Sequence, residues 1–290
     1  MTTELFEKHF QAEARMFMLA LIRIALAEDG PDLTAQGLFG EDEMAQAQII
    51  AKQSTVVAGL PLIPLILEFG DVKCNVHLNV DEGDRVSEGT MIAAIQGPAA
   101  HLLKAERVIM NFICHLSGIA ELTSRYVAEL QGTGTTLLDT RKTTPGLRYL
   151  EKYAVCVGGG QNHRKNLAEM LMLKDNHIDR AGSITQAVST LRNTYAQCPP
   201  IEVECRTLEE VKEASACDIQ RIMLDNMSPE MITEALTLVP DGIESEVSGN
   251  ISLANIKSIC QLGPDFISVG KLTHSAPASD FSMQFLALGA

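Results

Sequence analysis

Apolar residues in the second half of the chain form short, nearly continuous runs, separated by polar stretches with helical spacing. From residue 136 onward these runs predict seven strands, with the sequences TLLDT, AVCV, MLMLK, IEVEC, RIMLD, IESEV and FISVG. The stretches between them predict helices at 183–195, 208–215, 229–238 and 253–259. Strands that are apolar along their length and alternate with helices are typical of a parallel sheet. Seven strands in so short a segment favour an α/β barrel, complete or incomplete, over an open doubly wound sheet.

The first 115 residues show a different pattern, which predicts a separate unit. The apolar spacing over residues 1–30 predicts an amphipathic helix, and a polar loop with Gly30 and Pro31 follows it. A long helical pattern over 102–130 then leads into the second unit.

Alternating apolar and polar positions predict short strands between these two helical patterns, around Val56, over 72–80 and over 91–95. Residues 80–97 carry two glycines in polar turns, as a β-hairpin does. This hairpin resembles half of a biotinyl or lipoyl carrier domain. No lysine stands at the opposite hairpin tip, where such carriers are modified, so a carrier function is disfavoured.

Polar residues follow the predicted strands of the second half, where each strand ends. They are Asp139, Arg141, Lys174, Glu204, Asp225, Ser248 and Gly270. Active sites of α/β barrels are built at the carboxyl ends of the strands. The recurrence of polar residues at these points therefore predicts a functional site there.

Basic residues are concentrated between residues 137 and 178, although the chain as a whole is acidic. They are Arg141, Lys142, Arg148, Lys152, Arg164, Lys165 and Lys174. A solvated basic helix face is the ordinary explanation for such a run. Here several of the cations follow strand-like runs, and three glycines at 158–160 precede Asn162, His163 and Arg164. Glycines let the backbone approach a ligand closely, so the pattern favours a polyanion site.

Composition limits the classes of partner. The chain has 23 Lys and Arg against 37 Asp and Glu, a formal net charge of −14, which argues against nonspecific nucleic-acid binding. The most apolar run, residues 56–67, is too short to span a bilayer and is broken by Pro61 and Pro64. No export signal is evident. The seven cysteines have no metal-type spacing, so reduced thiols in a cytoplasmic protein are expected.

Two acidic residues at strand ends form a candidate carboxylate pair. Glu204 and Asp225 could bind ribose hydroxyls or a magnesium ion, which prefers a few carboxylates together with phosphate oxygens and water. The alternative is that each carboxylate pairs with a neighbouring arginine, Arg206 or Arg221.

Two glycine-containing turns are candidates for binding phosphate. Ser248, Gly249 and Asn250 precede a helix expected to start near Ile251, and the last strand ends in Val269, Gly270 and Lys271. A turn that leads into a helix N-terminus presents free backbone N–H groups to an anion.

The histidines fit anion binding and structural roles better than covalent catalysis. His163, after the glycine run, could donate hydrogen bonds to an anion, whereas His177 and His274 are expected to be structural or supporting. No Ser-His-Asp spacing, nucleophile elbow or HExxH motif is present, so hydrolysis through a covalent nucleophile is not indicated. The cations, carboxylates and phosphate-binding turns together suit a phosphorylated sugar pyrophosphate that reacts with a second anionic molecule.

Several ordered motifs resemble those of the quinolinate phosphoribosyltransferase family. They are ERVIMNF with LSGIA, DTRKTTPGLR, KYAV followed by GGGQNHR, LKDNHI and ISVGKLTHSAP, preceded by EDGPDLT near Glu28. The resemblance covers nearly the whole chain. It implies transfer of phosphoribosyl from phosphoribosyl pyrophosphate to quinolinate with decarboxylation, giving nicotinate mononucleotide, pyrophosphate and CO2 in NAD biosynthesis, with Mg2+ as cofactor.

The resemblance also implies the fold and the assembly. It implies an N-terminal α/β sandwich over residues 1–115, completed by 275–290, and a C-terminal, incomplete TIM-like α/β barrel over 116–274. The family forms a homodimer with a shared active site, and Arg107 would come from the partner chain.

By match of motif, the resemblance assigns the candidate residues to roles. Arg141, Lys142, His163, Arg164 and Lys174 would hold the substrate carboxylates and the pyrophosphate, with Thr140 beside them. Glu204 and Asp225 would face ribose and metal, and the turns 248–250 and 269–271 would hold the 5′-phosphate. Two positions depart from the pattern, since Cys156 stands where a basic residue is expected and Glu121 where a small polar residue is commoner.

Two other hypotheses stay open at this point. A related phosphoribosyltransferase acting on a monocarboxylate such as nicotinate would need fewer cations. A non-catalytic carrier or phosphate-binding module built from the same parts would not need the pair Glu204 and Asp225.

Overall fold

The computed structural model describes residues 2–40, 43–69 and 73–286. The chain divides into two compact units. Unit 1 comprises Met1–Ser124, Thr143–Gly159 and Leu272–Ala290, and unit 2 comprises Arg125–Lys142 and Gly160–Lys271. Val72, in a predicted strand, and residues 287–290, in the segment expected to complete the first domain, lie outside the described residues.

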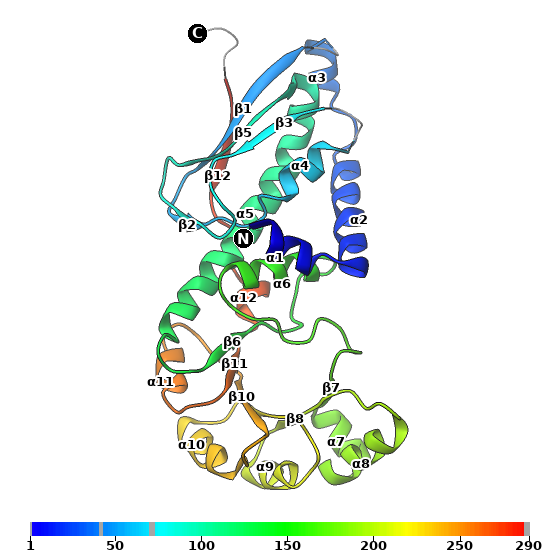
Figure 1. Ribbon diagram of the computed structural model, residues 1–290, viewed down its shortest axis with the longest axis vertical. Helices are drawn as coiled ribbons and strands as arrows, with labels where there is room; N and C mark the ends of the chain where they lie inside the picture. The colour runs from blue at the N-terminus through cyan, green and yellow to red at the C-terminus, as the bar shows by residue number, and fades with distance from the viewer. Residues whose placement is uncertain (1, 41–42, 70–72, 287–290) are drawn as a thin grey trace. The chain divides into compact units, whose positions relative to one another are not determined.

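Unit 1 contains a four-stranded antiparallel sheet in the order β12-β1-β5-β3 (Figure 1). Its strands are β1 (Met44–Ala51), β3 (Asn75–Leu78), β5 (Met91–Pro98) and β12 (Phe281–Leu286). A separate two-stranded sheet pairs β2 (Thr55–Val56) with β4 (Arg85–Val86). The strand β1 was missing from the sequence prediction.

The predicted hairpin over 80–97 is wrong in its pairing. The strand β5 pairs with β3 and β1, whereas β4, which lies between the two turns, pairs with β2. Gly83 and Gly89 have φ of 88° and 84°, as the turns require. The turns are anchored by backbone bonds from Gly83 to Val57 and from Gly89 to Ala51, which draw β4 away from β5.

The single helix predicted over residues 1–30 is two helices, α1 (Thr2–His9) and α2 (Ala12–Glu28). Ala12 has a φ of 42°, which is incompatible with a continuous right-handed helix. The break lets Phe6 and Phe10 pack against Tyr153, with ring centroids 5.5 and 5.2 Å away. Aromatic packing in the core of unit 1 thus overrides the helical periodicity of the sequence.

The run AVCV, predicted as a strand, lies in the helix α6 (Arg148–Val157). Residues 150–155 of this helix are all buried, so the apolar run reflects a helix enclosed on every side. A short apolar run of this kind cannot be assigned to strand or helix by periodicity alone.

The other helices of unit 1 are packed around its sheets. They are α3 (Leu33–Leu38), α4 (Leu62–Leu67) and most of the long helix α5 (Ala99–Glu129), which confirms the predicted helix over 102–130. Gly118 in α5 allows very close packing, because a Cβ there would lie 2.1 Å from the carbonyl oxygen of Pro277. The segment before β12 thereby rests directly on the α5 backbone.

Unit 1 also contains a carboxylate that holds a turn together. Glu82 accepts hydrogen bonds from the backbone N–H groups of Gly59 and Leu60, at 2.6 and 2.8 Å. Burial raises the pKa of Glu82 to about 7, although these two bonds and one from Tyr153 favour the charged form. Burial also raises the pKa of the Tyr153 phenol.

Unit 2 is built on a six-stranded parallel sheet in the order β6-β11-β10-β9-β8-β7 (Figure 1). The strands are β6 (Thr136–Leu138), β7 (Leu171–Leu173), β8 (Ile201–Cys205), β9 (Arg221–Asp225), β10 (Glu244–Ser248) and β11 (Phe266–Ser268). The last strand pairs with the first, as in a barrel. Between β6 and β7 an isolated parallel bridge from Leu138 to Gln161 stands in place of a strand, so the barrel is incomplete.

Helices alternate with these strands, as the sequence predicts. They are α7 (Asp175–Ala181), α8 (Ile184–Thr194), α9 (Leu208–Ser215), α10 (Pro229–Leu238) and α11 (Ile256–Cys260); α12 (Lys271–His274) follows the last strand. Figure 1 shows α9 and α10 lying outside the strands. Ser183, Thr207 and Ser228 cap α8, α9 and α10, since each side chain accepts a backbone N–H of the first turn.

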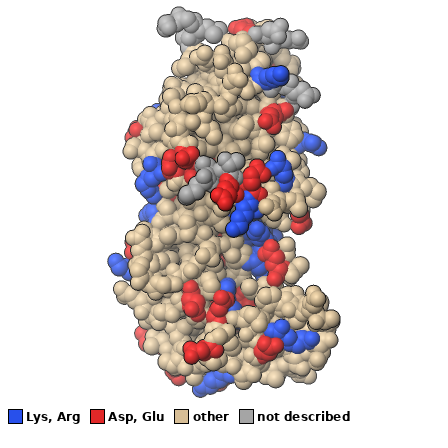
Figure 2. Space-filling view, viewed as in Figure 1, with Lys and Arg blue, Asp and Glu red and all other residues tan. Residues whose placement is uncertain are grey.

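The surface and the cysteines add little constraint on function. In Figure 2, basic and acidic side chains lie close to one another, so positive charge is divided into small groups on that face. Across the described ranges, no helix has the length and apolar character that crossing a membrane requires. None of the seven cysteines, all of which lie in the described part of the chain, forms a disulfide.

We predict that Gly118→Ala destabilises the protein by about 1–3 kcal/mol, because the added methyl group overlaps the Pro277 carbonyl. Gly37→Ala is the matched control, since Gly37 lies in α3 with no atom near the added methyl group. Denaturant unfolding of both variants measures the effect. Equal stability of the two variants would contradict the close packing of α5.

We also predict a pH-dependent stability difference between the wild type and Glu82→Gln. The raised pKa means that folded Glu82 binds a proton more readily than unfolded Glu82. The wild type should therefore lose stability relative to the variant as pH rises from the ordinary carboxyl range to about 7. Unfolding of both proteins at pH 5 and pH 8 tests this, with the same substitution at exposed Glu88 as control. A difference that does not change with pH would refute it.

Candidate active site

A cavity of about 400 Å³ lies in unit 2, at the carboxyl ends of its strands. Nine of the residues proposed from sequence line it: Thr140, Arg141, Lys142, His163, Arg164, Lys174, Glu204, Asp225 and Ser248. Met172, Met223, Asn226 and Ser268 complete the lining. The structure therefore brings together residues from every strand of the barrel.

The other proposed residues are placed differently. Gly249, Asn250, Val269, Gly270 and Lys271 neighbour lining residues in sequence but are not themselves part of the lining. Arg107 belongs to unit 1, where it is exposed on α5. Its role as a residue supplied by a partner chain stays a prediction.

Four cations of the basic segment line the cavity, namely Arg141, Lys142, Arg164 and Lys174. The Arg164 guanidinium is anchored below the cavity, because its Nη1 donates to the Met170 carbonyl at 2.8 Å. Burial and the neighbouring Arg141 lower the pKa of Arg164. Two like charges held close together in this way indicate that the cavity is suited to an anion.

The remaining cations of that segment are not in the lining. Arg148 and Lys152 belong to α6 in unit 1, where Arg148 donates to the Thr143 hydroxyl at 3.2 Å. Lys165 lies in unit 2, on the loop after His163. The excess of basic residues in the sequence therefore has more than one structural origin.

The carboxylates Glu204 and Asp225 are both directed to the cavity. Glu204 accepts a charged hydrogen bond from Lys174 Nζ at 2.6 Å, and Asp225 accepts one from the Asn226 amide at 2.8 Å. The alternative pairing with neighbouring arginines is wrong. Arg206 binds Asp179 and Glu210, and Arg221 binds Glu244 and Glu246.

The turn after β10 is shaped by close contact between two asparagines and a glycine. Gly249 has a φ of 96°, and a Cβ there would lie 2.3 Å from the Asn226 side-chain oxygen. Asn250 Nδ2 donates to the same oxygen at 3.1 Å. Asn226 and Asn250 themselves have φ of 54° and 53°, a conformation that asparagine tolerates better than most residues.

The prediction that this turn leads directly into a helix near Ile251, over 253–259, is wrong. The helix α11 begins at Ile256, because the Asn255 side chain first accepts the Ser252 backbone N–H at 2.7 Å and closes an intervening turn. The turn at the end of β11, by contrast, is followed at once by α12, which starts at Lys271.

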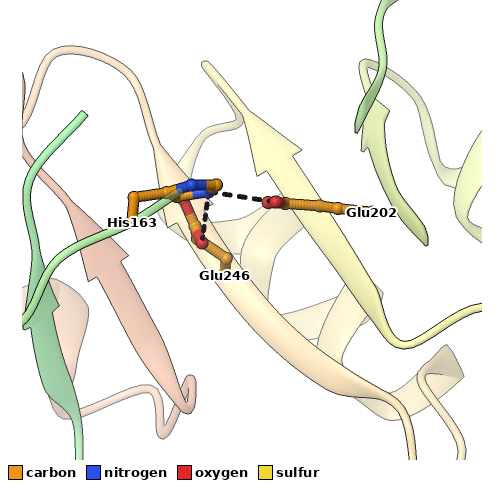
Figure 3. A group of neighbouring side chains, drawn as sticks. All are labelled: His163, Glu202 and Glu246. Carbon is orange, nitrogen blue, oxygen red and sulfur yellow. Dashed lines mark ion pairs between the residues drawn. The ribbon is translucent and has the colours of Figure 1, made fainter. Parts of the chain in front are cut away.

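His163 points toward the barrel interior (Figure 3). Its Nε2 lies 3.0 Å from Glu202 Oε2 and 3.5 Å from Glu246 Oε2, and its Nδ1 accepts the Arg164 backbone N–H at 2.7 Å. Both glutamates are fully buried. Burial raises the pKa of each to about 7, against the opposing charge of Arg221.

A buried aspartate fixes the backbone at His163. Asp139, fully buried at the end of β6, accepts the His163 N–H at 2.9 Å and the Asn162 side-chain amide at 2.7 Å. His163 is thus contacted from β8, from β10 and from the end of β6.

Sequence reasoning missed the interior-facing glutamates, Glu202 and Glu246, and four lining residues. Alternation along the strands carries the signal that could have found the two glutamates. In IEVEC, Glu202 is two positions before Glu204, and in IESEV, Glu246 is two positions before Ser248. Residues two apart share a face, so a carboxylate below a proposed ligand points into the same barrel.

The two positions that depart from the family pattern both lie in unit 1. Glu121 pairs with Arg85 at 2.9 Å and accepts the Val56 backbone N–H at 3.2 Å, so it ties α5 to the small sheet. Cys156, on α6, borders a second cavity together with Glu82 and Asp84. Neither residue belongs to the cavity in unit 2.

The chain matches family models along most of its length. Residues 32–117 match the N-terminal domain of quinolinate phosphoribosyl transferase, and residues 119–284 match the C-terminal domain.

Individual relatives agree with these matches. A probable nicotinate-nucleotide pyrophosphorylase [carboxylating] from Synechocystis is 44% identical over 266 residues, covering 90% of each chain. A quinolinate phosphoribosyltransferase [decarboxylating] from Nicotiana tabacum is 37% identical and covers 91% of this chain and 81% of its own. The crystal structure of NadC from Streptococcus pyogenes has a TM-score of 0.88 at 40% identity, covering 92% of this chain and 96% of that one.

These similarities extend across both units, and the solved structure shares the α/β architecture of an antiparallel sheet and an incomplete parallel barrel. The chain therefore belongs to the quinolinate phosphoribosyltransferase family.

Proposed function

We propose that this protein transfers phosphoribosyl from phosphoribosyl pyrophosphate to quinolinate and releases CO2, pyrophosphate and nicotinate mononucleotide. The observation that carries the proposal is one cavity lined by four cations and two carboxylates at the carboxyl ends of barrel strands. The relatives support the proposal, since one is named as a probable carboxylating nicotinate-nucleotide pyrophosphorylase and another as a decarboxylating quinolinate phosphoribosyltransferase.

The balance of charge favours a dicarboxylate over a monocarboxylate. Quinolinate brings two carboxylates, and the second substrate brings a phosphate and a pyrophosphate. Arg141, Lys142, Arg164 and Lys174 supply the opposite charge, with Thr140 and His163 beside them. Arginine suits carboxylate and phosphate because its planar fork binds two oxygens at once.

The same groups suit the transition state for phosphoribosyl transfer. As pyrophosphate leaves, the ribose carbon gains positive character, which Glu204 and Asp225 stabilise, while the lysines and arginines neutralise the leaving group. Lys174 Nζ lies 2.6 Å from Glu204 and so links the cations to the carboxylates of the cavity. The protein thus acts by placing fixed charges where charge develops.

Decarboxylation follows from the product of that step. Once the ring nitrogen carries ribose, it is cationic and stabilises the electron pair that stays on the adjacent ring carbon when its carboxylate leaves as CO2. A proton from water then completes the C–H bond of nicotinate mononucleotide at that carbon. The cavity holds the ring and its remaining carboxylate in place. Met172 and Met223 offer apolar surface in a lining that is otherwise polar.

Magnesium fits the oxygen donors of the cavity. Glu204 and Asp225 would hold it together with substrate oxygens and water, since Mg2+ is commonly bound by one or two carboxylates and substrate phosphates. When bound, it would neutralise charge on the pyrophosphate.

The 5′-phosphate would be held by backbone N–H groups of the turns 248–250 and 269–271. The conformation of Gly249 and the close approach of Asn226 favour an exposed backbone at the first turn.

We propose further that two chains form a homodimer in which Arg107 enters the partner's site. A non-catalytic carrier or phosphate-binding module would not need Glu204 and Asp225. Their presence in the cavity therefore disfavours that alternative.

Purified protein incubated with phosphoribosyl pyrophosphate, Mg2+ and carboxyl-labelled quinolinate should release labelled CO2. Omitting Mg2+ should abolish release. We expect Arg141→Ala to lower kcat/KM by about 100-fold or more, because it removes a fixed charge facing the substrate anions. Turnover of nicotinate without any CO2 from quinolinate would instead favour the monocarboxylate enzyme, and inactivity with both would favour a binding module.

Mixing two inactive variants, Arg107→Ala and Arg141→Ala, should restore activity if the site is shared. Random exchange makes half of the dimers heterodimers, each with one intact site, so about a quarter of wild-type activity should return. Arg141→Ala mixed with Arg164→Ala is the control, because every site then carries a damaged barrel. No recovery in the first mixture, despite verified subunit exchange, would place Arg107 outside a shared site.

A further inference from the structure

A connected set of buried polar contacts runs through the barrel interior below the cavity. Arg221 Nη1 donates to Glu246 Oε2 at 3.0 Å, and its Nε and Nη2 bind Glu244 at 3.0 and 2.8 Å. The guanidinium also lies 4.0 Å above the Phe266 ring. Glu202 and Glu246 in turn lie 3.0 and 3.5 Å from Nε2 of His163. Glu202, Glu246 and Arg221 are not part of the cavity lining.

The contacts of His163 define its tautomer. Nδ1 accepts the Arg164 backbone N–H, so the proton of a neutral ring must lie on Nε2. Nε2 lies within ion-pair distance of the carboxylates of Glu202 and Glu246, at 3.0 and 3.5 Å, so its proton is next to two acceptors. Each ring nitrogen therefore has a partner of the correct polarity.

The same contacts argue against a metal ion bound by His163, Glu202 and Glu246, although their ligand atoms lie within 4.8 Å of one another. A metal on Nε2 would displace its proton to Nδ1, because a metal-bound histidine normally donates through its other nitrogen. Here that nitrogen faces a backbone N–H, so two hydrogens would collide. Arg221, already paired with Glu246, also supplies a positive charge that a cation would repel.

The tautomer has a consequence for the neighbouring arginine. Arg164 is held at its backbone N–H by His163 and at its guanidinium by the carbonyl of Met170 and the sulfur of Met172, at 2.8 and 3.6 Å. If His163 carried its proton on Nδ1, the ring and the Arg164 N–H would repel each other. The orientation of the 163–164 peptide, and with it the direction of Arg164, depends on which nitrogen is protonated.

We propose that Glu202 and Glu246 are positioning residues that hold His163 as the Nε2–H tautomer and thereby fix Arg164 in the substrate cavity. The proposal rests on the proposed function, in which Arg164 binds a substrate anion. Asp139 fixes the backbone of the same segment from the other side, so the glutamates control the ring alone.

Two substitutions at one position separate the hydrogen bond from the charge. Glu202→Gln keeps an oxygen that accepts Nε2–H, whereas Glu202→Leu keeps the volume and removes the acceptor. We expect the glutamine variant to stay within about threefold of wild-type kcat/KM, and the leucine variant to lose about 10- to 100-fold, mostly through a higher KM for quinolinate. Glu244→Gln is the matched control, since exposed Glu244 binds only the outer side of Arg221.

A spectroscopic measurement tests the tautomer without any substrate. Two-bond 1H–15N spectra of [15N]histidine-labelled protein should show His163, assigned by its absence in His163→Gln, with a protonated Nε2 and a bare Nδ1. Glu202→Gln should keep this pattern and Glu202→Leu should lose it. The spectrum reports on the wild type directly, so it remains informative if the leucine variant does not fold.

The outcomes separate this inference from the proposed function. A single Nε2–H tautomer together with inactivity toward quinolinate would leave the inference intact and overturn the function. Normal turnover together with a protonated Nδ1, or with a fully active Glu202→Leu, would overturn the inference. A stoichiometric divalent cation in the purified protein, lost in Glu202→Leu, would also overturn it.

Discussion

Pairing of buried charge inside an incomplete barrel is the constraint on which the site depends. Isolated ions in a protein interior cost several kcal/mol each, so Glu246 and Glu202 can be buried only beside Arg221 and His163. Stability alone does not require these charges, since replacing buried ion pairs by packed apolar residues is often neutral or favourable. These charges instead make the barrel interior below the cavity polar. Their desolvation lowers the stability of the fold.

The strand order converts this interior into a binding site. Because neighbouring strands are parallel, Glu202, Arg221 and Glu244 lie side by side on β8, β9 and β10. Residues that follow them on each strand lie closer to the cavity at the carboxyl ends. Side chains further along, such as Glu204, two positions after Glu202, and Asp225, four positions after Arg221, therefore line the cavity, while Glu202 and Arg221 lie below it. The strands β8, β9 and β10 each contribute a residue of the cavity lining and a buried charged residue below it.

Much of this could be predicted from sequence, and the failures have identifiable causes. Lys174, Glu204 and Asp225 were found because the ends of parallel strands share one edge, whatever the exact strand limits. The run AVCV in α6 was assigned to a strand because a short apolar run looks the same in a buried helix and in a buried strand. The start of α11 was misplaced because the Asn255 side chain competes with the helix for backbone N–H groups. Glu202 and Glu246 were missed because buried carboxylates become intelligible only when Arg221 and His163 are known to lie beside them.

The gap between β6 and β7 has a consequence for the directions of the side chains that it contains. A regular strand there would place Asn162 and Arg164 on one face and His163 on the other, since side chains alternate along a strand. With only one bridge, from Leu138 to Gln161, the segment directs three successive side chains to three destinations: Asp139, the interior glutamates and the cavity. A complete barrel would gain backbone hydrogen bonds here, but its side chains would alternate between two faces and could not take these three directions.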